Sequence, residues 1–162
     1  MAEYWHLEPA CREKAQEFFV SYPEAEVELQ FDIAEKDFVN SGKGSAEVKN
    51  VLKRLGVNAD ALRRVAVASY EAEINVTAHS YGGRMHSYIY DDFVYIRFED
   101  TGPGIADIEQ AMEPGFSTAD ELVREMGFGA GLGLANIKKN SDVMHLVSAA
   151  GEPTVLEILL YY

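Results

Sequence analysis

Three polar residues recur at four-residue spacing along one apolar stretch of the chain. A helix is expected over about residues 59–79, with Glu71, Asn75 and His79 in successive turns, each rotated by only about 40° from the last. The opposite, more polar side of this helix is expected to hold Ser69, Glu73 and Thr77. A carboxylate followed one turn later by an amide can provide a general base and a magnesium ligand on one rigid rod. A satisfied buried network is the alternative, because polar groups removed from water must be paired.

A second polar segment, Asp100-Thr101-Gly102-Pro103-Gly104-Ile105, directly follows a predicted strand. Glycines allow the chain to turn sharply and to lie close to a bound ring. An aspartate at the end of a strand can accept hydrogen bonds from a buried donor such as an exocyclic amine. The segment is therefore a candidate for base recognition, although an Asp-x-Gly pair is also a common turn.

A third segment, Gly127-Phe128-Gly129-Ala130-Gly131-Leu132-Gly133, leads directly into a helix expected over about 134–141. Alternating glycines before a helix N-terminus expose backbone N–H groups and form a cradle for an anion such as a phosphate. A dinucleotide-binding fingerprint would need a preceding strand in a βαβ unit, and residues 121–126 are expected to form a polar loop. A P-loop is excluded because no Gly-Lys-Ser/Thr follows.

Length and charge restrict the kinds of protein that can carry these residues. The chain has 162 residues, enough for one domain, with Lys+Arg 14 against Asp+Glu 27 and a net charge of −13. This acidity and the lack of a basic patch argue against direct nucleic-acid binding. Cys11 is the single cysteine, which excludes an intrachain disulfide. No membrane span or secretory signal is visible, so a cytoplasmic protein is expected.

The elements that must position the three segments follow from hydrophobic periodicity. Period-two alternation predicts strands at about 26–34, 84–90, 93–99, 144–148 and 154–160. Helical spacing predicts, besides the helices above, one that ends at Gly56 and a short one at 105–112. The first 23 or so residues are expected to form a short amphipathic helix outside the main fold, giving an N-terminal extension over 1–25 and a domain over 26–162.

The order of these elements does not alternate as repeated βαβ units would. It predicts an α/β two-layer sandwich, with a mixed, mostly antiparallel sheet covered by helices on one face.

Taken together and in this order, the helix with Glu71, Asn75 and His79, the 100–105 segment and the 127–133 loop resemble the N, G1 and G2 boxes of the GHKL (Bergerat-fold) ATPases. The resemblance covers about residues 26–162. Within that superfamily the chain is most similar to the anti-sigma factor serine/threonine kinases and the related switch kinases. Glu71 argues against a detached histidine-kinase catalytic domain, whose N box usually lacks this glutamate.

Further residues resemble other parts of these kinases. Phe116-Ser117-Thr118 and the following Glu121-Leu122-Val123-Arg124 are similar to the nucleotide lid, where an arginine approaches the γ-phosphate. Thr154 is similar to the threonine that helps to hold adenine, although Glu152-Pro153 lengthens the preceding turn by one residue. The glycine loop is closer to the switch-kinase form.

The resemblance implies ATP and Mg²⁺ as cofactors and a role for each matching residue. Asp100 would receive the adenine amine, Asn75 would hold Mg²⁺, Arg124 would neutralise charge on the γ-phosphoryl group, and Glu71 would be the general base. The expected nucleotide contacts are Asn75, His79, Asp100, Gly102, Gly104, Ile105, Thr118, Gly127, Gly129, Ala130, Gly131, Leu132, Gly133 and Thr154.

Two functions are consistent with this resemblance. One is a serine/threonine protein kinase that phosphorylates a STAS-like anti-anti-sigma partner and also holds a sigma factor or another regulator. The other is a non-catalytic module whose affinity for a partner depends on bound ATP. The presence of Glu71 favours the kinase, because a binding module has no need of a general base. A homodimer, formed through the first helix or a sheet edge, is a further expectation from the resemblance.

Overall fold

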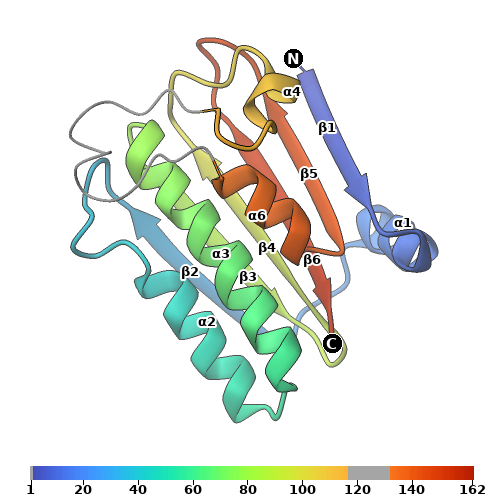
Figure 1. Ribbon diagram of the computed structural model, residues 1–162. Coiled ribbons are helices and arrows are strands. Elements are labelled where there is room, and N and C mark those ends of the chain that lie inside the picture. Colours follow the sequence, from blue (N-terminus) through green and yellow to red (C-terminus); the bar gives the residue numbers. More distant parts are fainter. Residues whose placement is uncertain (1, 117–131) are drawn as a thin grey trace.

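The computed structural model describes residues 2–116 and 132–162, and these residues contain one antiparallel sheet of six strands. The strand order is β1-β5-β6-β4-β3-β2, and every neighbouring pair is antiparallel (Figure 1). The strands are β1 (Ala2–Leu7), β2 (Val27–Ile33), β3 (Gly83–Ile89), β4 (Phe93–Asp100), β5 (Val143–Ser148) and β6 (Val155–Tyr161).

Three helices lie side by side over one face of this sheet: α2 (Lys43–Arg54), α3 (Ala59–His79) and α6 (Gly133–Asn140) (Figure 1). The longest, α3, begins where the side chain of Asn58 accepts a hydrogen bond from the backbone N–H of Ala61, at 2.9 Å. A short helix, α4 (Ile108–Ala111), lies at the end of the sheet near β5.

Alternation along the strands divides the sheet into two faces. On β4, Val94, Ile96 and Phe98 are buried under the helices with Ala72 and Val76 of α3. This layer forms the main hydrophobic core and fixes α3 over the centre of the sheet.

The other face of the sheet is partly covered by α1 (Arg12–Ser21), which follows the 3₁₀ turn η1 (Pro9–Cys11). Ala15 and Phe18 of α1 pack against Tyr95, Val143 and Leu159 in a second, smaller hydrophobic cluster. The predicted α/β sandwich with a mostly antiparallel sheet is confirmed. The prediction of helices on one face is incomplete because α1 lies on the opposite face.

The N-terminal residues differ most from the sequence prediction. A helix over the first 23 or so residues is correct for α1 and wrong for residues 2–7, which form the edge strand β1 paired with β5 from Ala2↔Ser148 to Leu7↔Val143. The physical reason is that successive side chains of this segment point to opposite faces of the sheet. Tyr4 packs on the main core, whereas Trp5 stacks on His145 of the other face at 3.7 Å between ring centroids.

None of the described helices is both long and apolar enough to cross a membrane.

Candidate active site

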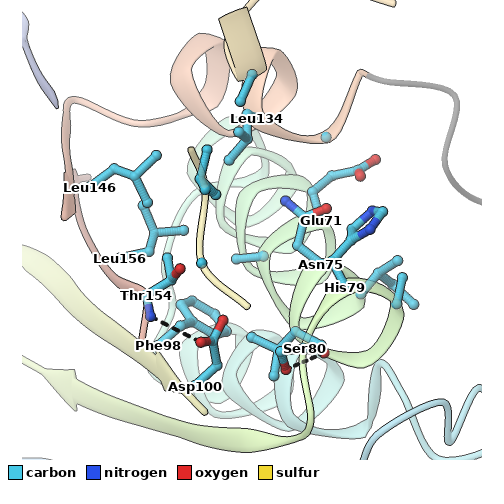
Figure 2. A pocket seen from close by; sticks show the side chains of 18 of the residues that line it. Glu71, Asn75, His79, Ser80, Phe98, Asp100, Leu134, Leu146, Thr154 and Leu156 are labelled. Atoms are coloured by element: carbon cyan, nitrogen blue, oxygen red, sulfur yellow. Dashed lines mark hydrogen bonds between the residues drawn. The ribbon is translucent and has the colours of Figure 1, made fainter. Parts of the chain in front are cut away.

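A cavity of about 830 Å³ opens between α3, α6 and the segment that follows β4. Figure 2 shows its polar wall on α3 and its apolar floor, which Phe98, Leu146 and Leu156 form from three neighbouring strands. A cleft of this size with a mainly apolar floor and a few convergent polar groups is typical of a small-molecule site.

The polar wall consists of the stripe that the sequence predicts. Glu71, Asn75 and His79 lie one above another on α3 and face the cavity (Figure 2). They are half-buried, and no hydrogen bond joins the Glu71 carboxylate to another described residue. The alternative of a satisfied buried network therefore does not describe Glu71, whose carboxylate borders the open cavity.

The opposite side of α3 holds Ser69, Glu73 and Thr77 as predicted, and this polar side is buried. Glu73 is only 3% exposed, because α2 packs against this side. The Glu73 carboxylate accepts backbone N–H groups of Gly42 at 2.8 Å, Ser45 at 2.9 Å and Gly44 at 3.3 Å. These donors are the N-cap residue Gly42 and the first turn of α2, where a helix leaves N–H groups unpaired and favours negative charge.

Glu73 thus makes a structural contact that the sequence prediction missed. Its three hydrogen bonds join α3 to the N-terminus of α2, on the side of α3 away from Glu71 and Asn75. No signal for this contact was available in the sequence, because Ser41-Gly42-Lys43-Gly44-Ser45 already offers serine, a preferred N-cap residue, to the following helix.

Asp100 lies across the cavity from the α3 stripe, at the end of β4 (Figure 2). Its Oδ1 accepts the backbone N–H of Thr154 at 2.9 Å, and its own N–H donates to the Thr154 carbonyl at 3.0 Å. Burial raises the pKa of Asp100, against the lowering effect of the Thr154 N–H. The second carboxylate oxygen has no hydrogen-bond partner among the described residues and is available to a ligand.

The glycines after Asp100 are required by close packing. Gly104 has φ +74°, and a Cβ there would lie 1.8 Å from the carbonyl oxygen of Ala149. A Cβ on Gly102 would lie 3.0 Å from Ser80 Cβ and 3.2 Å from Asp100 Oδ1. The segment therefore lies closely against the end of the sheet, which keeps Asp100 in place.

The N-terminus of α6 approaches the α3 stripe. A Cβ on Gly133 would lie 3.1 Å from Asn75 Oδ1 and 3.3 Å from Glu71 Oε2. The partial positive charge at a helix N-terminus attracts anions to this place. Leu132 borders the same part of the cavity and is 46% exposed, and Ile105 lines its wall.

Several predicted site residues lie outside the described residues: Thr118, Arg124, Gly127, Gly129, Ala130 and Gly131. Among the described ones, the structure brings Glu71, Asn75, His79, Asp100, Gly104, Ile105, Leu132, Gly133 and Thr154 to one cavity. Gly102 packs directly behind it against Asp100.

The described part of the chain offers no metal site made of protein side chains alone. Within residues 2–116 and 132–162, no group of three or more His, Cys, Asp or Glu side chains could hold a metal ion. Asn75 can contribute one oxygen, which suits a cation such as Mg²⁺ that is bound largely through phosphate and water oxygens.

Comparison with known proteins agrees with this geometry. Residues 43–158 match the family described as histidine kinase-, DNA gyrase B-, and HSP90-like ATPases, a match that runs from α2 into β6 and includes all three predicted segments. The chain belongs to this family. The resemblance to GHKL ATPases is therefore confirmed.

Individual relatives of the chain are bacterial regulatory proteins. The serine/threonine-protein kinase RsbT of Bacillus subtilis is 33% identical over 115 residues, which are 68% of this chain and 80% of that protein. The anti-sigma F factor of Oceanobacillus iheyensis is 28% identical over 121 residues, which are 71% of this chain and 80% of that protein. The anti-sigma F factor of Anoxybacillus flavithermus is 25% identical over 140 residues, which are 83% of this chain and 90% of that protein.

Proposed function

We propose that the protein is an ATP-dependent serine/threonine protein kinase of the partner-switching type. The observation that carries this proposal is the position of Glu71, a carboxylate without a hydrogen-bond partner among the described residues, one turn before Asn75 and beside the N-terminus of α6. Such a carboxylate can act as a general base next to an anion site. The name of the relative RsbT, a serine/threonine-protein kinase, supports the same activity.

The residues of the cavity fit an adenine nucleotide. The free oxygen of Asp100 is an acceptor for the adenine amine at one end of the cavity, and the apolar floor with Phe98 suits the base. At the other end, the N-terminus of α6 at Gly133 offers backbone N–H groups to the phosphates. Family membership among ATPases points to the same ligand.

The reaction assigns the residues distinct tasks. Bound ATP with Mg²⁺ supplies an activated γ-phosphoryl group. In this proposal Asn75 contributes an oxygen to Mg²⁺, and Glu71 accepts the proton of the attacking hydroxyl of a serine or threonine. Arg124 neutralises charge on the transferred group, and Thr118 contacts the nucleotide.

The remaining predicted nucleotide contacts also belong to this proposal. His79 lies one turn beyond Asn75 on α3 and is a further nucleotide contact in this proposal. The glycine loop with Gly127, Gly129, Ala130 and Gly131 cradles the phosphates through backbone N–H groups.

The proposed protein substrate is a STAS-like anti-anti-sigma protein. A sigma factor is a second proposed partner, by analogy with relatives that are named anti-sigma F factors. A homodimer is proposed from the resemblance to the kinase family.

Calorimetry with Mg-ATP tests the nucleotide site first. Wild type is expected to bind at micromolar strength, and Asp100→Asn is expected to abolish binding because an amide presents a donor towards the adenine amine. A wild-type protein that binds no ATP would disprove the proposal.

Phosphoryl transfer is then measured with ATP labelled at the γ-phosphate and individually purified STAS-domain proteins of the same organism. Transfer by wild type, lost in Glu71→Ala although ATP still binds, is the expected result. ATP binding without transfer to any of them would indicate the non-catalytic switch module instead.

A further inference from the structure

A chain of three hydrogen bonds lies behind the part of the cavity assigned to the base. The backbone N–H of Ile105 donates to Ser148 Oγ at 2.8 Å, and Ser148 Oγ lies 2.7 Å from Thr154 Oγ1. The backbone N–H of Thr154 donates to Asp100 Oδ1 at 2.9 Å. Ser148 is completely buried in β5, whereas Thr154 lines the cavity.

The direction of the hydroxyl protons in this chain follows from what each group can donate. Ser148 Oγ already accepts the Ile105 N–H, and the single described acceptor within reach of its own proton is Thr154 Oγ1. A buried hydroxyl proton needs an acceptor, so Ser148 is the donor of this pair. The proton of Thr154 then has no acceptor among the described residues and is left for the cavity.

The cavity therefore presents an acceptor and a donor side by side, the free oxygen of Asp100 and the hydroxyl of Thr154. We propose that Ser148 is a specificity-determining positioning residue, which makes the Thr154 hydroxyl a donor and so selects a base that carries an N–H donor next to an acceptor nitrogen. This inference rests on the proposed nucleotide binding and adds to it the role of a side chain that the nucleotide does not touch.

Comparing adenine with hypoxanthine distinguishes a Thr154 hydroxyl that donates a hydrogen bond from one that accepts. Adenine has an amine at position 6 and an acceptor nitrogen at position 1, which match Asp100 and Thr154. Hypoxanthine has a carbonyl oxygen and an N–H at these positions, so both contacts are mismatched. Without Ser148, the Thr154 hydroxyl can rotate and accept the N–H, which removes one of the two mismatches.

The test is the ratio of the dissociation constants of Mg-ITP and Mg-ATP, measured by calorimetry on four proteins: wild type, Ser148→Ala, Thr154→Val and the double variant. One hydrogen bond corresponds to roughly a three- to tenfold change. Ser148→Ala is expected to lower the ratio by about this factor. In the Thr154→Val background the same substitution is expected to leave the ratio unchanged, because Ser148 acts through the Thr154 hydroxyl.

A matched control removes another buried hydroxyl from the same sheet. Ser87 on β3 is completely buried and its Oγ has no hydrogen-bond partner among the described residues. Ser87→Ala is expected to leave the ratio at its wild-type value. If Ser148→Ala does not fold, as judged by thermal melting, Ser148→Cys fills the site with a weaker donor and is expected to lower the ratio in the same direction.

The results that would overturn this inference differ from the one that would disprove the proposed function. An equal loss of ATP and ITP affinity in Ser148→Ala, or a change of the ratio that persists in the Thr154→Val background, would overturn the inference, since either indicates a merely structural role. An unchanged ratio in Ser148→Ala would also overturn it. Failure of wild type to bind ATP at all would instead disprove the proposed function.

Discussion

Glu71 and Glu73 are two residues apart on α3, and their substitution by alanine is predicted to affect different properties of the protein. Glu73 is 3% exposed and accepts three backbone N–H groups at the N-terminus of α2, whereas the carboxylate of Glu71 borders the cavity without a hydrogen bond to another described residue. Glu73→Ala should therefore destabilise the fold, and Glu71→Ala should impair the reaction alone.

The expected loss for Glu73→Ala can be worked from its contacts. The bonds from Gly42 and Ser45, at 2.8 and 2.9 Å, each contribute at least about 1.5 kcal/mol as hydrogen bonds to a charged group. The third, at 3.3 Å, adds little. The free energy of unfolding should fall by about 3 kcal/mol, a large part of the roughly 5–15 kcal/mol of an ordinary domain.

Urea unfolding followed by circular dichroism measures this loss, with Glu71→Ala as the matched control. Glu71→Ala should unfold within about 0.5 kcal/mol of wild type, since it removes no described hydrogen bond. Its phosphoryl-transfer rate should fall by ~10²–10⁴ with ATP affinity nearly unchanged, as expected for loss of a general base. A Glu73→Ala protein as stable as wild type, or a Glu71→Ala protein that is clearly destabilised, would refute the assignment of the two carboxylates.

Two further predictions concern the loop after β4 and the N-terminal strand. Gly104→Ala should lower the melting temperature and weaken ATP binding at least tenfold, because its Cβ would lie 1.8 Å from a carbonyl oxygen. Gly151→Ala is the control: Gly151 has φ +78° with open space around it, so this variant should show backbone strain without loss of ATP binding. Burial acts to lower the pKa of His145, but hydrogen bonds to the carboxylates of Glu157 at 2.9 Å and Glu3 at 2.8 Å raise it overall. Since the folded-state pKa lies above the unfolded one, His145 stabilises the fold fully below about pH 6.5 and loses this effect as the pH rises through its folded-state pKa. Urea unfolding of wild type should show this decline and that of His145→Gln should not; equal pH profiles would contradict the prediction.

Most of the helical layer and the sheet could be predicted because each element has its own periodicity. The alternating stretch of β4 and the long apolar helix α3 are examples, and α3 has the predicted bounds of 59–79. Residues 2–7 could not be predicted in this way. Six residues are too few for a strand pattern to be distinguished from a helical one, and β1 depends on pairing with β5, which is distant in the sequence.

The cavity side of α3 was predictable and its other side was not, for one physical reason. Spacing along a helix shows which side chains share a side, and this is enough to bring Glu71, Asn75 and His79 together. It does not show what covers each side. Glu73 and Thr77 have the composition of a solvent-exposed side, and they are buried because the N-terminus of α2 supplies the donors for Glu73.

The two carboxylates of α3 connect the proposed site to the helical layer. In the proposed reaction Glu71 acts on a hydroxyl, and its carboxylate has no hydrogen-bond partner among the described residues, whereas the Glu73 carboxylate two residues later is bonded to α2. Because both carboxylates belong to one helix, a change near Gly42 that displaces α3 would also move Asn75 relative to Gly133. The contacts between α2 and α3 are therefore expected to influence the proposed site, and Tyr70, which lies against Gly42, itself lines the cavity.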